Sequence, residues 1–272
     1  MINKNKKIGF IGAGNMATAL ISGLVNSGKD SSTIMASSPE QEHLETVSSK
    51  FGISTSNNNK EVAKNCSTIL LAVKPNIIEE VLNDIAPFIE SDKHLIISIA
   101  AGVIIDDIQT PLGGRQRIIR AMPNTPASIQ KGVTALCRNS HASTLDTKLA
   151  EEIFKSAGVT CWLEEKSLDQ YTALIGSGPA YVFYVIEALM EASKGLDIKE
   201  EDIKRLLIDM IIGSSELAKI SEDEPSILRK KVTSPGGVTQ RAIEVLEENK
   251  TKETIVNAIK EATKRSIDLG NK

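Results

Sequence analysis

The sequence is poor in aromatic residues, histidine, cysteine and net charge, and each shortage argues against a class of function. Aromatic side chains make up 3% of the 272 residues, which argues against a surface that stacks nucleic-acid bases. The 32 basic and 35 acidic residues leave a net charge of −3, so there is no basic footprint for nucleic acid or an anionic membrane. We expect no nucleic acid and no membrane among the partners.

Cysteine and histidine are too scarce and too scattered for a metal centre or a disulfide framework. The six residues are Cys66, Cys137, Cys161, His43, His94 and His141. The sequence contains no CxxC pair, and the spacings do not match those of zinc ligands. We therefore predict no metal, and three idle thiols in a reducing cytoplasm.

We expect no long apolar run. The longest apolar stretch, Leu95–Ile105, is shorter than the ~20 residues of a membrane-spanning helix. The basic start, Met1–Lys7, superficially resembles a signal peptide, but glycines break the apolar segment that follows. The sequence predicts a soluble, cytoplasmic protein.

The first part of the chain alternates short apolar runs with helical patterns, which predicts an α/β domain with a parallel, doubly wound sheet. Strands are expected at Lys7–Ile11, Thr33–Ser37, Ile69–Val73, Leu95–Ile99, Arg117–Ala121, Val133–Leu136 and Val159–Trp162. Helices are expected at Met16–Ser27, Pro39–Phe51, Asn76–Ala86 and about Ser143–Ala157. Proline would occupy the first turn of the second of these helices. The polar segment Ser54–Lys60 is expected to be a loop.

After Leu163 no strand pattern recurs, which predicts a domain of residues 1–164 followed by an all-helical domain of residues 165–272. Its helices are expected at Leu168–Ile175, Ala180–Lys194, Lys199–Ile220, Ser226–Val232, Val238–Glu248 and Thr251–Leu269. The glycines and proline of Gly176–Ala180 predict a sharp bend between the first two of these helices.

A dinucleotide-binding fingerprint follows the first strand. Gly12-Ala13-Gly14-Asn15-Met16-Ala17 fits GxGxxA between a strand and a helix. The first glycine permits the tight turn, the second lets the backbone approach a pyrophosphate, and the small last residue allows close packing. The alternative is an ordinary glycine-rich turn. The context indicates a Rossmann-type domain.

The second strand ends in hydroxyl groups where NAD-binding domains carry an acid. That acid grips the ribose 2′-hydroxyl, but Ala36-Ser37-Ser38-Pro39 has none. Serines can hydrogen-bond to a 2′-phosphate, which favours NADPH, with NADH still possible. The alternative is that Ser38 only caps the next helix. Lys74, after the following strand, is either close to the cofactor or an ordinary surface charge.

The last third of the chain suggests an anion site and an imine substrate. Thr233–Thr239, with a proline and two glycines, opens a helix whose N-terminus suits a carboxylate or phosphate. No histidine follows His141, and Tyr171, Tyr181 and Tyr184 are expected in the core. An imine is easily protonated before hydride arrives, so imine reduction is favoured over ketone reduction.

Together these motifs resemble the pyrroline-5-carboxylate reductase family along the whole chain. The matching segments are Ile8–Ala17 (IGFIGAGNMA), Met35–Pro39 (MASSP), Ala72–Pro75 (AVKP), Ser98–Gly102, Arg120–Pro126 (RAMPNTP), Gly176–Tyr181 (GSGPAY) and Val232–Thr239 (VTSPGGVT). The resemblance implies reduction of L-1-pyrroline-5-carboxylate to L-proline with NAD(P)H, the last step of proline synthesis. It also implies a Rossmann-type domain followed by an all-helical dimerisation domain, and a homodimer or a larger assembly of dimers.

The resemblance assigns residues to both ligands. Cofactor contacts would come from Ile11, Gly12, Ala13, Gly14, Asn15 and Met16 at the pyrophosphate, Ser37 and Ser38 at the adenosine phosphate, Asn59 at the ribose, and Ala72, Val73, Lys74, Pro75, Ile99, Ala100 and Ala101 at the nicotinamide. Substrate contacts would come from Glu165, Ser234, Gly236, Gly237, Val238 and Thr239. Thr239 would be catalytic, with its hydroxyl at the ring nitrogen.

Two other functions are compatible with part of this pattern. A beta-hydroxyacid dehydrogenase has the same plan of two domains. Enzymes of that class resemble one another through a catalytic lysine in the helical half. That lysine is missing from Gly178-Pro179-Ala180-Tyr181. A cofactor-sensing or lipid-associated binding protein without catalysis is the other alternative, and the intact SPGGVT turn argues against it.

Overall fold

The computed structural model of the chain describes residues 7–270. They form two compact units. The first comprises the residues up to Ser177 together with those from Ala262 onward, and the second is Gly178–Glu261. Each unit is described by itself.

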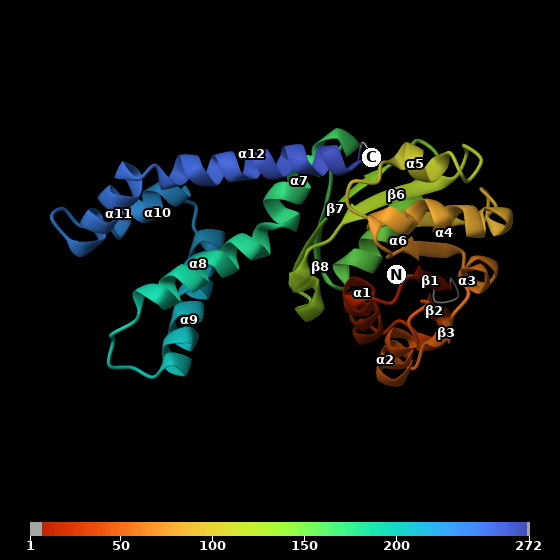
Figure 1. Cartoon of the computed structure of the whole chain (residues 1–272), viewed down its shortest axis with the longest axis horizontal. Helices are drawn as coiled ribbons and strands as arrows, with labels where there is room; N and C mark the ends of the chain where they lie inside the picture. Colours follow the sequence, from red (N-terminus) through yellow and green to blue (C-terminus); the bar gives the residue numbers. More distant parts are fainter. Residues whose placement is uncertain (1–6, 271–272) are drawn as a thin grey trace. The chain divides into compact units, whose positions relative to one another are not determined.

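The first unit is built on one eight-stranded sheet with the order β3-β2-β1-β4-β5-β6-β7-β8 (Figure 1). The strands are β1 (Ile8–Ile11), β2 (Ile34–Ser37), β3 (Ser54–Ser56), β4 (Thr68–Leu71), β5 (Leu95–Ser98), β6 (Arg117–Met122), β7 (Gly132–Arg138) and β8 (Gly158–Trp162). β1 pairs in parallel with both β2 and β4, so that Ile8 lies opposite Ile34 and Thr68. The predicted doubly wound sheet is confirmed.

One pair of strands departs from the all-parallel expectation. β6 and β7 run antiparallel, with Ala121 opposite Leu136, and β8 then runs parallel to β7. Antiparallel neighbours need no crossover helix. Here the connection is the short 3-10 helix Thr125–Ile129, which a pattern of alternating strands and helices could not reveal.

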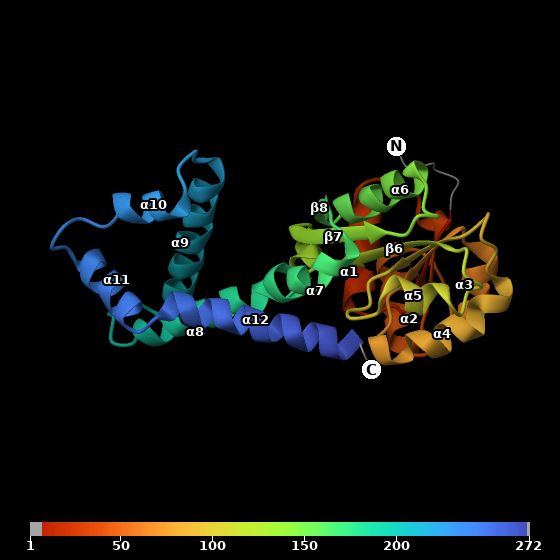
Figure 2. The same ribbon diagram turned by 90° about the horizontal axis from the view of Figure 1, so that it is seen from above.

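Helices cover both faces of this sheet (Figure 2). The apolar cluster on one face contains side chains from α1 (Asn15–Asn26), α2 (Gln41–Phe51) and α6 (Thr144–Lys155). The cluster on the other face contains side chains from α3 (Asn59–Asn65), α4 (Ile78–Ile85), α5 (Ile105–Gln109) and α7 (Leu168–Tyr171). Because β1 is buried on both faces, it reads as a continuous apolar run.

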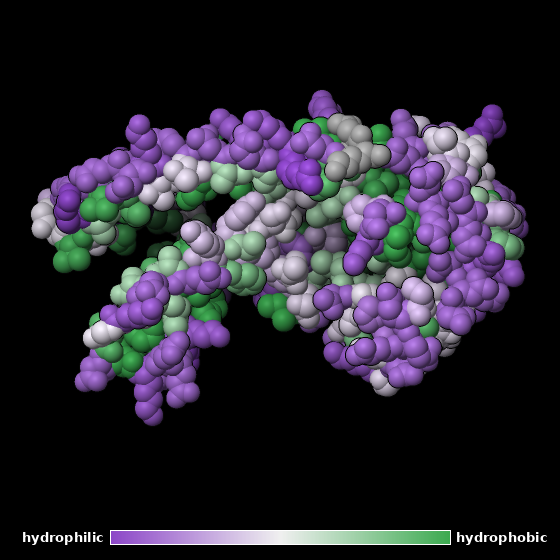
Figure 3. All heavy atoms as spheres, in the orientation of Figure 1, coloured by the Kyte–Doolittle hydropathy of each residue, from purple (hydrophilic) through white to green (hydrophobic). Residues whose placement is uncertain are grey.

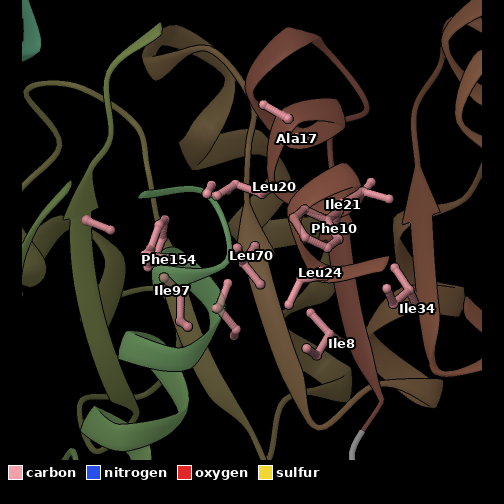
Figure 4. Close-up of a cluster of buried hydrophobic side chains, with 14 of the residues drawn as sticks. Ile8, Phe10, Ala17, Leu20, Ile21, Leu24, Ile34, Leu70, Ile97 and Phe154 are labelled. Atoms are coloured by element: carbon pink, nitrogen blue, oxygen red, sulfur yellow. The ribbon is translucent and has the colours of Figure 1, made fainter. Parts of the chain in front are cut away.

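Alternate side chains of β1 enter the two clusters. Phe10 packs with Leu20 and Leu24 of α1 on one face (Figure 4). Ile11 belongs to the cluster on the other face. This packing fixes α1 directly after β1. The loop between them is therefore held at the carboxyl end of β1.

Local expectations are wrong at several points, among them the start of α2 and the segment before α3. The helix expected to begin at Pro39 begins at Gln41, and Pro39 and Glu40 lie outside it. The polar segment expected to be a loop holds the edge strand β3 and the start of α3, which Asn58 caps by accepting a hydrogen bond from Lys60 N–H. An edge strand needs less apolar sequence, which explains why a polar run could hide it.

The second unit is helical. Its elements are α8 (Gly178–Ala192), α9 (Glu200–Ile220), α10 (Pro225–Lys231), α11 (Val238–Glu248) and most of α12 (Thr251–Gly270). Apolar side chains gather on the surface of these helices (Figure 3). Tyr184 and Phe183 are 73% and 58% exposed, so the expectation that Tyr184 lies in the core is wrong, whereas Tyr171 is buried.

One helix is long and apolar enough to cross a membrane by length and composition. It runs over Glu165–Ala192, and 6% of its most apolar window is buried within the chain. The apparent break at Gly176–Ala180 hid this stretch from the sequence analysis. In the structure a π-helical turn, Thr172–Gly176, carries the helix up to a bend at Ser177.

Candidate functional site

The loop after β1 occupies the point where the order of the strands reverses. β2 lies on one side of β1 and β4 on the other, which is where open α/β sheets bind ligands. Gly12 N–H donates to Ser37 O at 2.8 Å, and Ala72 N–H donates to Ile11 O at 2.7 Å. Gly12 has φ +101°, and a Cβ there would collide with Ala72 O. Only glycine fits this turn.

The N-terminus of α1 faces open space. Gly14 is its N-cap, and a glycine has no side chain to cap the helix. A Cβ on Gly14 would meet no atom within 4 Å. The helix has no acidic residue in its first turn. Asn15 and Met16 begin the helix and Ala13 is buried behind the loop. Backbone N–H groups at such an end suit a pyrophosphate.

The ends of β2 and α3 meet through side chains. Ser37 is fully buried, and its hydroxyl donates to Asn59 Oδ1 at 2.8 Å. Asn59 is the first residue of α3. The expected adenosine and ribose residues are therefore brought together across 22 positions of sequence.

Glu40 is a carboxylate that the sequence analysis missed. Ser38 Oγ donates to Glu40 Oε2 at 2.6 Å and accepts from Glu40 N–H at 3.2 Å. The hydrogen bond from the Ser38 hydroxyl favours the charged form and lowers the pKa of the Glu40 carboxyl group. The sequence does show this acid: Glu40 lies two residues after Ser38, directly after Pro39.

The loops after β4 and β5 lie beside the β1 loop, because these strands are neighbours in the sheet. Ala72 and Val73 are half-buried, whereas Lys74 and Pro75 are exposed and lead into the 3-10 helix Pro75–Ile77. Lys74 also favours the ionised form of Glu40, which lowers the pKa of that carboxyl further.

Three contacts hold the loop after β5. Ile99 N–H donates to Leu71 O at 3.1 Å, and Ala100 N–H donates to Ser98 Oγ at 3.3 Å. Farther along, Gly102 (φ +77°) lies against Gly270 at the end of α12. Ala101 sits between these fixed points. The sheet therefore brings together the three loops expected to hold the cofactor.

Glu165 lies in the first unit and is already engaged there. Its Oε1 accepts from Arg120 Nη1 at 2.6 Å and from Ile105 N–H at 2.8 Å. Arg120 is buried, with 4% of its side chain exposed, while 35% of the Glu165 side chain is exposed. The carboxylate thus joins β6, the start of α5 and the segment that leads into α7.

The expected substrate turn lies in the second unit. Gly237 is the N-cap of α11 and makes no side-chain hydrogen bond, and Val238 and Thr239 follow it, both exposed. Ser234 O accepts from Gly237 N–H at 3.0 Å, and Gly236 (φ +69°) donates its N–H to a glutamine side chain one turn along.

The backbone N–H groups of the turn differ in whether they have an acceptor. Those of Gly236 and Gly237 have acceptors within the chain. Over residues 7–270 the structure records no acceptor for those of Val238 and Thr239. The first turn of α11 also carries no acidic residue. This end of the helix can accept a carboxylate.

Metal or thiol chemistry finds no support in the described part of the chain. Across residues 7–270 no three His, Cys, Asp or Glu side chains gather as metal ligands. Burial raises the pKa of Cys66 and of Cys137 to about 11, so both remain neutral thiols.

The strand order of the first unit, with a glycine turn and an open helix N-terminus where that order reverses, is that of a Rossmann-type nucleotide-binding protein. The family model described as "Pyrroline-5-carboxylate reductase dimerisation" matches residues 165–269, and "NADP oxidoreductase coenzyme F420-dependent" matches residues 7–102. A pyrroline-5-carboxylate reductase of Pseudomonas aeruginosa is 35% identical over 264 residues, 97% of this chain and 96% of its own length. The chain belongs to the pyrroline-5-carboxylate reductase family, which confirms the resemblance.

Solved structures agree with this assignment. The crystal structure of Plasmodium falciparum pyrroline carboxylate reductase with NADP bound has a TM-score of 0.90 at 33% identity, and the match covers 98% of this chain and 99% of that one. A pyrroline-5-carboxylate reductase from Coxiella burnetii has a TM-score of 0.89 at 37% identity, covering 97% and 98%. These two reductases therefore share both parts of the fold with this chain along nearly its whole length.

Proposed function

We propose that the chain reduces L-1-pyrroline-5-carboxylate to L-proline with NADPH as the preferred cofactor. The observation that carries this proposal is the presence, in one chain, of a dinucleotide crevice and an uncapped helix N-terminus in the sequence SPGGVT. Membership of the family supports the same reaction. The beta-hydroxyacid alternative is not favoured, and neither is a binding protein without catalysis.

The residues around the crevice suit a dinucleotide. The open space at Gly14 would admit a pyrophosphate onto the start of α1. Ser38 would meet the adenosine phosphate once its hydroxyl leaves Glu40, and Asn59 would meet the ribose. The loops after β4 and β5 would line the nicotinamide. Bound NAD(P)H would supply the hydride that adds to the carbon of the C=N bond.

On the substrate side, the first turn of α11 would hold the carboxylate through the amide hydrogens of Val238 and Thr239, with the turn from Ser234 to Gly237 shaping the site. The Thr239 hydroxyl would hydrogen-bond to the ring nitrogen and help to deliver the accompanying proton. Glu165 would border the pocket while it holds Arg120.

We also propose that residues 165–272 form a dimerisation domain, and that the assembly is a cytoplasmic homodimer or a larger assembly built from dimers. The exposed apolar surface of α8, with Phe183 and Tyr184, needs a partner, and a second copy would cover it rather than lipid. Sedimentation at micromolar concentration should give a dimer or more. A monomer, or protein that floats with lipid vesicles, would contradict this.

The activity is tested by following NADPH oxidation. Purified protein should consume NADPH only when pyrroline-5-carboxylate is added, and it should leave a 3-hydroxy acid with NAD unchanged. Oxidation of the hydroxy acid without reduction of the cyclic imine would favour the dehydrogenase alternative. Tight NADPH binding without turnover of either would favour the binding protein.

A further inference from the structure

A neutral side chain, Gln240, closes the turn that precedes α11. Its Oε1 accepts from Gly236 N–H at 2.7 Å, and its Nε2 donates to Glu244 Oε1 at 2.8 Å. The two contacts fix which way the amide points, since only its oxygen can accept and only its nitrogen can donate. Gly236 is held in its left-handed conformation, φ +69°, by this bond.

This arrangement resembles one half of a capping box, but Gln240 reaches Gly236 N–H, one residue before the N-cap Gly237, and Gly237 has no side chain to complete the box. In a capping box the third residue of the helix reaches back to a backbone N–H before the helix. In α6 that residue is Asp146, whose Oδ2 accepts from Ser143 N–H at 2.8 Å, so the box carries a negative charge. In α11 the third residue is Gln240, which satisfies the backbone N–H without charge.

Along α11 the first negative charge lies one turn farther from the substrate turn. Glu244 occupies that position, and Arg241 Nη1 lies 3.3 Å from its other carboxylate oxygen. An acid at position 240 would stand beside the free amide hydrogens of Val238 and Thr239. A carboxylate there would repel an anionic ligand and compete for the positive end of the helix.

We infer that Gln240 is a positioning and specificity-determining residue for the substrate carboxylate. It holds the turn around Gly236 in shape, as an acidic capping residue would, and it keeps negative charge away from the carboxylate site. This inference rests on the proposed function, since it concerns the substrate site of that reaction.

The sharpest test moves one charge along the helix. The double variant Gln240→Glu with Glu244→Gln keeps the net charge, and the exchanged groups can still form both hydrogen bonds. The Michaelis constant (KM) for pyrroline-5-carboxylate should rise about 10-fold, the effect of one like charge at a few ångströms in a partly solvated site. The KM for NADPH should stay at the parent value, and added salt should reduce the effect.

Two single variants separate charge from shape. Glu244→Gln alone provides the reference, because it carries the same change at position 244. Gln240→Met removes the amide but adds no charge, so its rise in substrate KM should be smaller and insensitive to salt. Melting temperatures establish that each variant is folded.

The results distinguish a failure of the proposed function from a failure of the role of Gln240. If the parent shows no turnover of pyrroline-5-carboxylate, the proposed function fails, and this inference fails with it. If the parent is active but the double variant keeps the parent's substrate KM, only the role of Gln240 is overturned. A rise equal to that of Gln240→Met and independent of salt would also overturn it.

Discussion

Arg120 Nη1 lies 2.6 Å from Glu165 Oε1, and this ion pair joins strand β6 to the segment that begins the long helix Glu165–Ala192. The same carboxylate oxygen accepts from Ile105 N–H, at the first residue of α5. One side chain therefore ties together three elements near the carboxyl ends of β5 and β6, next to the loop after β5.

Replacing Glu165 with alanine should lower the free energy of unfolding by about 2 kcal/mol. The change would leave the buried Arg120 guanidinium without its anion, and such a loss costs about 3–5 kcal/mol in a fully buried pair. The estimate is smaller here because a third of the Glu165 side chain meets solvent. Urea denaturation measures the difference. Replacing both residues, Arg120 by Met and Glu165 by Ala, should recover part of the loss, and an unchanged midpoint for the single variant would contradict this role.

Replacing Glu40 with glutamine should lower the KM for NADPH more than that for NADH. The Glu40 carboxylate accepts from the Ser38 hydroxyl, and this hydrogen bond lowers its pKa by favouring the charged form. A negative charge beside Ser38 opposes a 2′-phosphate but not a 2′-hydroxyl. Initial rates with each cofactor give the comparison. Ser38→Asp is the companion of opposite sign and should raise the KM for NADPH. Equal changes with both cofactors would place the adenosine phosphate elsewhere.

Replacing Gly270 with alanine should destabilise the first unit by about 1–2 kcal/mol and weaken NADPH binding. A Cβ on Gly270 would meet Gly102 O at 2.5 Å, so the end of α12 would push on the loop after β5. Thermal unfolding and titration with NADPH measure the two effects. Asp268→Ala is the control, since Asp268 is exposed on the same last turn. If both variants behave alike, the contact with Gly102 has no influence on the loop.

Replacing Thr239 with alanine should slow turnover of pyrroline-5-carboxylate by roughly 5- to 150-fold, the loss of about 1–3 kcal/mol for one hydrogen bond. The side chain is exposed at the start of α11, so the melting temperature and the affinity for NADPH should remain close to the parent values. Thr239→Val keeps the shape of the side chain and should behave like the alanine variant. Parental rates in both would make Thr239 a structural residue, with the proton coming from water.

The sheet and its crevice were predictable because glycine spacing and apolar runs are local signals. The GxGxxA motif and the strand before it predicted the tight turn at Gly12, where the structure shows a positive φ. Contacts between distant segments carry no such signal. The hydrogen bond from Ser37 to Asn59 depends on the edge strand β3, whose polar sequence resembled a loop.

Charged and polar side chains around the sites were harder to foresee. Glu40 lies beyond the end of β2, where NAD-binding domains carry their acid, and only the fold of the turn after Pro39 brings it to Ser38. Gln240 is an ordinary residue of an amphipathic helix until the turn before it is built. Side-chain hydrogen bonds of this kind follow from geometry rather than from residue type.

The most direct test of the account is the fate of the transferred hydrogen. With NADPH carrying deuterium at both C4 positions, the product should be L-proline with one deuterium on the carbon that had been doubly bonded to nitrogen. One L-proline should form for each NADPH consumed, as mass spectrometry and absorbance would show together. Proline without deuterium, or NADPH oxidation without proline, would contradict direct hydride transfer to pyrroline-5-carboxylate by this chain.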